Sequence, residues 1–125
     1  MPLDPQLEPH LEEAARLNNL DPLILRSVLG GESGYNPGAV SPKGAIGIAQ
    51  FMPSTEKGRG FTAGQNPHKD IEESAKYLDE LYRGHLKDGN DENAARYLAL
   101  QSYNAGDRRV RQATEANPLR QETLD

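Results

Sequence analysis

Cysteine and tryptophan are both absent from this chain of 125 residues, and aromatic residues make up only 6% of it. The lack of cysteine excludes disulfide scaffolds, thiolate zinc sites, cysteine nucleophiles and iron–sulfur clusters. The length allows one domain, because two domains would each be too small to bury a sizeable core.

Long apolar stretches are missing as well. The longest strongly apolar run covers only residues 23–25, far below the roughly 20 residues that a membrane-spanning helix needs. The first nine residues carry neither a basic group nor an apolar stretch, so we expect no secretory signal there. The sequence therefore predicts no membrane span, and export would need another route or a leader that has been removed.

An excess of positive charge is also lacking, since 14 Lys and Arg face 19 Asp and Glu, for a formal net charge of −5. Nucleic-acid backbones are bound by clustered basic residues that release counterions. The one basic cluster, Arg108, Arg109 and Arg111, is typical of a solvated helix face, so no nucleic-acid partner is expected. The three histidines are scattered and the glycines fit turns, so we expect neither a metal site nor a cofactor.

Helical signals dominate what is present, and they begin with two Asp-Pro pairs. Asp4-Pro5 and Asp21-Pro22 each place a capping side chain before a residue suited to the first helical turn. Apolar residues then recur at helical spacing over 5–19 and from 22 to about 32. Four glycines and two prolines within 31–44 predict a long loop. Short helices are expected over 45–52 and 53–58.

The second half of the chain repeats this pattern with aspartates as expected N-caps. Asp70 and Asp91 each precede apolar residues in helical phase, Gly106 is expected to end the second helix, and Asp107 could cap a last one. The alternation typical of strands is missing. The sequence thus predicts a mainly α fold of about six to seven helices.

Glu32 is the most informative residue for function. It lies on the apolar stripe of its expected helix, directly before the glycine-rich loop. Burial without a cationic partner raises the pKa of a carboxyl group and keeps a proton available for general-acid catalysis near neutral pH. The alternative is that the stripe ends one turn earlier and Glu32 simply faces water.

Residues 31–55 resemble the signature of the soluble lytic transglycosylases, a family of lysozyme-like enzymes. The matching elements are Glu32-Ser33, Asn36-Pro37, Ala39-Val40-Ser41, Gly44-Ala45, Gly47 with Gln50, and Met52-Pro53. Two later blocks, 68–78 and 100–110, resemble the family's Tyr-Leu helix and its Tyr-Asn-Ala-Gly-Pro segment. The resemblance covers about residues 15–123, nearly the whole chain.

This resemblance implies a single lysozyme-like domain over 1–125 with a substrate groove. It also implies that Glu32 is the catalytic acid and that four residues contact substrate: Ser41, Gln50, Tyr103 and Asn104. Each of the four has a structural alternative. Ser41 could be a turn residue, Gln50 could cap neighbouring backbone, Tyr103 could belong to the core, and Asn104 could be a left-handed residue at a helix end.

The implied reaction cleaves the MurNAc-β-1,4-GlcNAc bond of peptidoglycan glycan strands without water. Ordinary glycosidases need two carboxylates. In this family one Glu protonates the leaving oxygen and then takes the proton of the C6 hydroxyl, which closes on C1 to give a 1,6-anhydro end. Two alternatives stay open: a hydrolytic muramidase in which Glu56 or Asp70 positions a water, and a glycan-binding module without catalysis.

Several positions depart from the family pattern. Asp70 stands where Asn is usual, Ser74 where Gly is, Asp107 where Pro is, and 48–49 where Leu-Met is common; as an N-cap, Asp70 would keep the local role. Residues 118–125 resemble the start of the family's last helix. We therefore expect a segment of a longer polypeptide, or else a protein without that helix.

The expected setting is the periplasm or the cell wall. A compact murein-cleaving domain of this kind suits a bacteriophage virion protein or a module of a secretion apparatus, and the phage setting is favoured slightly. An acidic domain would not need attraction to an anionic wall if a larger protein held it there.

Overall fold

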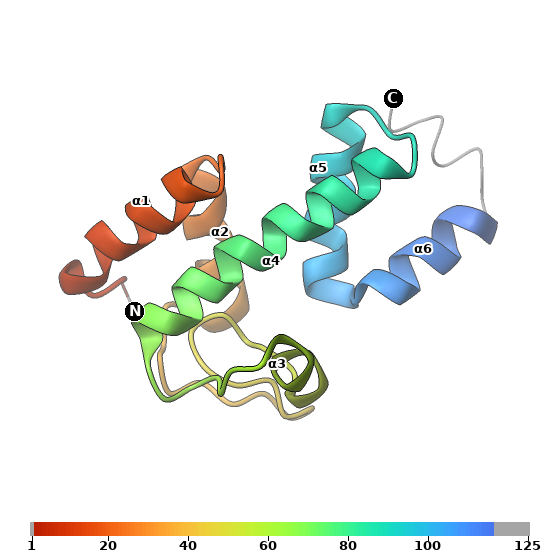
Figure 1. Ribbon diagram of the computed structural model, residues 1–125. Coiled ribbons are helices and arrows are strands. Elements are labelled where there is room, and N and C mark those ends of the chain that lie inside the picture. The colour runs from red at the N-terminus through yellow and green to blue at the C-terminus, as the bar shows by residue number, and fades with distance from the viewer. Residues whose placement is uncertain (1, 117–125) are drawn as a thin grey trace. The chain divides into compact units, whose positions relative to one another are not determined.

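The computed structural model describes residues 2–116, and its regular elements in that range are helices. They are the 3-10 helix η1 (Pro5–Leu7), α1 (Glu8–Leu17), α2 (Pro22–Ser33), α3 (Pro53–Arg59), α4 (Pro67–Lys87), α5 (Glu92–Ala105) and α6 (Asp107–Ala116) (Figure 1). The mainly α fold class is confirmed. Within the described range, no helix has both the length and the apolar character to cross a membrane.

The chain divides into two compact units, the first ending at Lys76 and the second beginning at Tyr77. Helix α4 starts in the first unit and ends in the second.

The first unit opens with two helices whose caps were predicted. Asp4 accepts a hydrogen bond from the backbone N–H of Gln6, and Asp21 accepts one from Leu23, both at 2.9 Å. The single helix expected over 5–19 is divided, because Pro9 has no amide hydrogen to donate to the carbonyl of Pro5. The first turn is therefore a 3-10 turn, and α1 follows it.

Helices α1 and α2 are joined by apolar packing and by one ion pair. Leu11 of α1 and Leu25 and Leu29 of α2 are fully buried. The guanidinium of Arg26 on α2 binds both carboxylate oxygens of Glu8 on α1. This two-pronged contact fixes the rotation of α2 about its axis more tightly than a single bond would.

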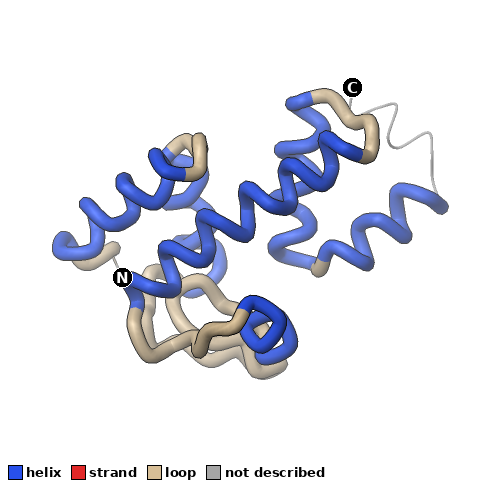
Figure 2. Tube along the Cα trace, in the orientation of Figure 1, coloured by secondary structure: helices blue, strands red, loops and turns tan. Residues whose placement is uncertain are grey.

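The helix expected over 45–52 was wrong, because this segment is loop (Figure 2), with a tight turn over residues 47–50. Isolated antiparallel bridges join Ile46 to Val40 on one side and to Phe51 on the other. Gly47 and Gln50 have φ values of 85° and 54°, in the left-handed region that a right-handed helix excludes. The apolar spacing reflects a buried turn, in which the side chains of residues 48, 49 and 51 face the core.

The short helix expected over 53–58 is confirmed as α3, but the predicted cap of α4 was wrong. Asn66 caps α4, since its Oδ1 accepts from the backbone N–H of His68 at 3.0 Å, and Pro67 takes the first helical position. Asp70 lies one turn inside the helix and is fully buried. Its Oδ2 accepts from the N–H of Gly64 at 2.9 Å, which ties the preceding loop to α4.

Helices α3 and α4 are also held by a nearly buried ion pair. Arg59 Nη2 lies 3.0 Å from Glu73 Oε2, and the two side chains are 14% and 10% exposed. A pair this well shielded depends on both partners, because removing one would leave the other charged and desolvated.

The second unit consists of the C-terminal part of α4 with α5 and α6. Leu78, Leu81 and His85 are buried on one face of α4. Asp91 caps α5 as predicted, accepting from the N–H of Ala94 at 2.8 Å. Helix α5 ends at Ala105, where Gly106 has a φ of 94°. Asp107 is the first residue of α6 and not the cap before it.

Two adjacent glycines of α2 give a matched stability test. A Cβ at Gly30 would lie 2.8 Å from the Tyr35 hydroxyl oxygen, whereas a Cβ at Gly31 would meet nothing within 4 Å. We expect Gly30→Ala to lower the free energy of unfolding by about 1–3 kcal/mol through overpacking. Gly31→Ala should raise it by about 0.5–1 kcal/mol through helix propensity. Urea unfolding followed by circular dichroism measures both, and equal effects would contradict the close packing of Tyr35 on Gly30.

Candidate active site

Glu32 lies at the end of α2, one residue before the last helical residue, Ser33. Its side chain is partly buried. Burial raises the pKa of Glu32 to about 7. The unpaired carbonyl groups at a helix C-terminus disfavour an anion in the same direction. The sequence alternative of a fully solvated Glu32 therefore does not fit, and the group has the pKa of a general acid.

Ser33 connects the end of α2 to the tight turn of residues 47–50. Its Oγ lies 2.6 Å from the carbonyl oxygen of Ile48 and 3.1 Å from that of Leu29, so its single proton is donated at this junction. Gly34, with a φ of 62°, ends the helix by donating its N–H to the carbonyl of Gly30. Sequence reasoning noted Ser33 only as a motif member. Its position next to the candidate acid was the available signal for a supporting role.

Ser41 lies in the turn between Val40 and Ile46, which the first bridge joins. Its Oγ accepts from the N–H of Ala45 at 2.9 Å, and its own N–H donates to the carbonyl of Ala45 at 2.9 Å. Ser41 thus stabilises this turn. A hydroxyl oxygen that accepts a bond keeps its own hydrogen for donation, so contact with substrate stays a prediction.

Gln50 caps neighbouring backbone, as the alternative reading proposed. Its Nε2 donates to the carbonyl oxygens of Ala39 at 3.1 Å and Gly47 at 2.9 Å. With both amide hydrogens directed at the backbone, the group left to meet a substrate is the amide oxygen. Substrate contact by Gln50 also remains a prediction.

Tyr103 and Asn104 lie in the last turn of α5, in the second unit. The ring of Tyr103 is partly buried and its centroid is 5.4 Å from that of Tyr77, whereas Asn104 is exposed. Asn104 is helical, so the idea that it is a left-handed helix-end residue was wrong, because Gly106 supplies the positive φ. Glu32, Ser41 and Gln50 all belong to the first unit.

Glu56 and Asp70 are the two carboxyl groups considered for positioning a water. Both accept hydrogen bonds from backbone N–H groups. Glu56 Oε2 accepts from the N–H of Ala63 at 2.5 Å, and Asp70 binds the next residue, Gly64. Burial raises the pKa of Asp70; the Gly64 bond opposes this and the nearby Glu56 charge adds to it. Both groups shape the loop between α3 and α4.

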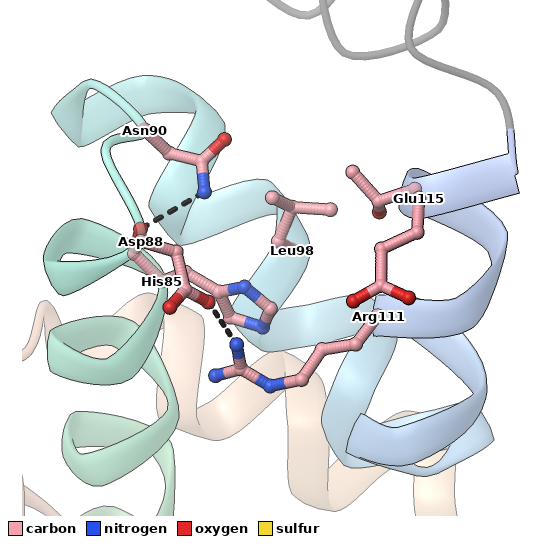
Figure 3. A pocket seen from close by; sticks show the side chains of 7 residues that line it. His85, Asp88, Asn90, Leu98, Arg111 and Glu115 are labelled. Carbon is pink, nitrogen blue, oxygen red and sulfur yellow. Dashed lines mark hydrogen bonds and ion pairs between the residues drawn. The ribbon is translucent and has the colours of Figure 1, made fainter.

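The second unit contains a separate cavity of about 220 Å³. It is lined by His85, Asp88, Asn90, Leu98, Arg111, Thr114 and Glu115 (Figure 3). None of the five site residues predicted from sequence lines it. Across residues 2–116, no three His, Asp or Glu side chains converge as ligands of a metal ion would.

The sequence matches the Transglycosylase SLT domain family over residues 10–124. The chain therefore belongs to this family, and the resemblance inferred from the motifs is confirmed.

Curated relatives carry corresponding names. The chain is 33% identical over 113 residues to the endo-type membrane-bound lytic murein transglycosylase A of Klebsiella pneumoniae strain 342, covering 81% of this chain and 55% of that protein. It is 35% identical over 102 residues to the membrane-bound lytic murein transglycosylase F of Saccharophagus degradans, covering 82% and 20%. The chain thus spans about half the length of the first relative and a fifth of the second.

The raised pKa of Glu32 predicts how stability varies with pH. Below its ordinary value of 4.5, the group is protonated in both the folded and unfolded states. As pH rises from 4.5 to about 7, the unfolded chain ionises while the folded state keeps its proton, so stability is lost over this interval and is fully lost above the folded pKa. We expect the free energy of unfolding of Glu32→Gln to exceed that of the wild type by on the order of 2 kcal/mol at pH 8. The two proteins should differ little at pH 4.

Glu73→Gln is the control of opposite sign. Burial raises the pKa of Glu73, but the hydrogen bond and charge of Arg59 outweigh it, so the net pKa is lowered. Its stabilising contribution is present above the ordinary pKa and is lost as pH falls through the lowered one. Urea titrations at each pH test both variants, and a pH-independent effect of Glu32→Gln would contradict the assigned pKa.

Proposed function

We propose that this chain is a peptidoglycan lytic transglycosylase that cleaves the MurNAc-β-1,4-GlcNAc bond and leaves 1,6-anhydro-MurNAc ends. The observation that carries the proposal is Glu32, a partly buried carboxyl group with a pKa raised to about 7. Family membership and the names of the relatives support the same activity.

One carboxyl group suffices for the proposed chemistry. Protonated Glu32 donates its proton to the glycosidic oxygen as the bond to C1 breaks. The resulting carboxylate takes the proton from the C6 hydroxyl of the same MurNAc, and that oxygen forms the new bond to C1. Glu32 regains its proton, so atoms and charge balance. A pKa near the working pH suits a group that is an acid and then a base.

The state of the other carboxyl groups supports this reaction over hydrolysis. A hydrolytic enzyme would need a second carboxylate to activate or position water. Glu56 is bonded to the backbone of Ala63, and Asp70 is fully buried against Gly64. Asp70 lacks the access that a water-activating base requires, and Glu56 has one of its two oxygens occupied by the backbone.

Four further side chains are proposed to bind the glycan strand. The hydroxyl of Ser41 and the exposed amide of Asn104 would orient the N-acetyl group, and the amide oxygen of Gln50 would accept from a sugar hydroxyl. Tyr103 presents an aromatic face of the kind that packs against sugar rings. A non-catalytic glycan-binding module would need these contacts but gives no reason for the raised pKa of Glu32.

We further propose that residues 1–125 form one catalytic domain that a larger virion or secretion-apparatus protein carries to the periplasm or cell wall. The support is electrostatic: the net charge of −5 gives no long-range attraction to an anionic wall. A tethered domain reaches a high local concentration without that attraction.

Digestion of purified peptidoglycan, analysed by mass spectrometry, tests the proposed reaction. The wild-type protein should release fragments that are lighter by one water than hydrolytic products. Glu32→Gln should lower the rate by about 10²–10⁴-fold, since loss of a general acid typically costs that much, and the fold should persist because the volume is nearly unchanged.

Glu56→Gln is the matched control, because glutamine still offers an oxygen to the N–H of Ala63. It should retain wild-type activity. Gln50→Ala and Tyr103→Phe should lower the rate of cleavage, but less than Glu32→Gln does. Hydrated products together with an inactive Glu56→Gln would favour the muramidase. Binding without any cleavage by the wild-type protein would favour the glycan-binding module.

A further inference from the structure

His85 lies near the end of α4 and is almost fully buried, with 2% of its surface exposed. Its Nε2 lies 2.9 Å from Ser102 Oγ and 3.1 Å from Asp107 Oδ1. Ser102 is itself 1% exposed, so its hydroxyl depends on a partner inside the protein. One ring nitrogen thus contacts two other helices at once.

The two residues that His85 contacts flank the segment with the proposed substrate contacts. Ser102 directly precedes Tyr103 and Asn104, and Asp107 directly follows Gly106, where the chain turns from α5 into α6. Gly106 has a φ of 94° and little resistance of its own to a change of backbone angle. A contact on each side of it would restrict that freedom.

We propose that His85 is a positioning residue that fixes the Tyr103–Asn104 end of α5 through Ser102 on one side and Asp107 on the other. The functional part of this inference rests on the proposed function, because it takes Tyr103 and Asn104 as substrate contacts. The sequence motifs assign no role to His85.

Asp107 is held in place by a second contact. Arg111 Nε donates to Asp107 Oδ2 at 2.7 Å, and the same guanidinium pairs with Asp88 at the end of α4. Asp107 Oδ1 is buried and makes no hydrogen bond within residues 2–116; it lies 3.1 Å from His85 Nε2. Arg111 thus fixes the carboxylate within α6, with Oδ1 beside the imidazole of α4.

The backbone of His85 is held in place as well. Asn90 Nδ2 donates to the carbonyl oxygen of His85 at 2.9 Å. Figure 3 shows this bond, with the imidazole and the Arg111 side chain facing the same cavity. Because the His85 backbone is fixed, its imidazole can hold Ser102 and Asp107 in place.

The histidine, serine and aspartate do not form a nucleophilic relay. In such a relay one ring nitrogen takes the serine proton while the other donates to the carboxylate. Here Nε2 makes both contacts. Because one nitrogen contacts both partners, the two-sided geometry of a relay is missing.

The test compares His85→Gln with His85→Leu. Glutamine places an amide N–H near the position of Nε2, whereas leucine fills the space without a donor. On soluble, uncrosslinked glycan strands, we expect His85→Leu to raise KM so that kcat/KM falls about tenfold, since a small misplacement of binding groups costs that order of rate. His85→Gln should stay within about twofold of wild type.

Leu81→Ala is the destabilised control, because Leu81 lies one turn earlier on the same buried face of α4 and has no polar contact to lose. It should lower Tm without changing KM. Equal KM values for His85→Leu and wild type, or a KM that rises equally in Leu81→Ala, would overturn the inference.

Amide hydrogen exchange separates this inference from the proposed function. The N–H of Gly106 donates to the carbonyl of Ser102 at 2.8 Å, so its exchange rate reports on the end of α5. His85→Leu should speed exchange over residues 103–106, and His85→Gln should not. A wild-type protein without activity would contradict the proposed function alone, whereas unchanged exchange in His85→Leu would overturn the positioning role whatever the activity.

Discussion

The candidate site depends on a carboxyl group that is partly removed from water and given no positive partner. Burial is the cause that raises the pKa of Glu32 to about 7. Arg26, on the same helix, binds Glu8 with both of its terminal nitrogens. The ion pair between α1 and α2 thus holds in place the helix that carries Glu32.

Polar side chains in the first unit serve the backbone more than they serve each other. Ser33 binds the carbonyl of Ile48, and Asp70 binds the N–H of Gly64. Gln50 binds the carbonyls of Gly47 in its own turn and of Ala39 eleven residues earlier. The segment between α2 and α4 has little regular structure of its own, so most of its backbone groups cannot pair within a helix. These side chains supply the missing partners, and they hold the loop beside Glu32 in one conformation.

The sequence was a good guide where a structure is encoded locally. The caps Asp4, Asp21 and Asp91 could be predicted because a cap needs only its next three residues. The segment 45–52 could not, since its apolar spacing fits a helix and the left-handed backbone at Gln50 is imposed by tertiary contacts. Asp70 was misplaced for a related reason: a buried aspartate and a capping one look alike in sequence. The position of Glu32 was predicted by its stripe, but the extent of its burial depends on tertiary packing that a single sequence does not display.

Asp70 also restricts how this domain can vary in evolution. A Cβ at position 47 would lie 2.4 Å from Asp70 Oδ2, and one at position 64 would lie 2.4 Å from the side chain of Ile46. Both glycines have positive φ as well, so a single substitution at either position meets a steric and a conformational barrier together. Amino-acid substitutions at these two positions, in the loops before and after α3, therefore require coordinated changes elsewhere. Gly58, where a Cβ would meet nothing within 4 Å, is open to single steps, so variation in this region is expected to collect on α3.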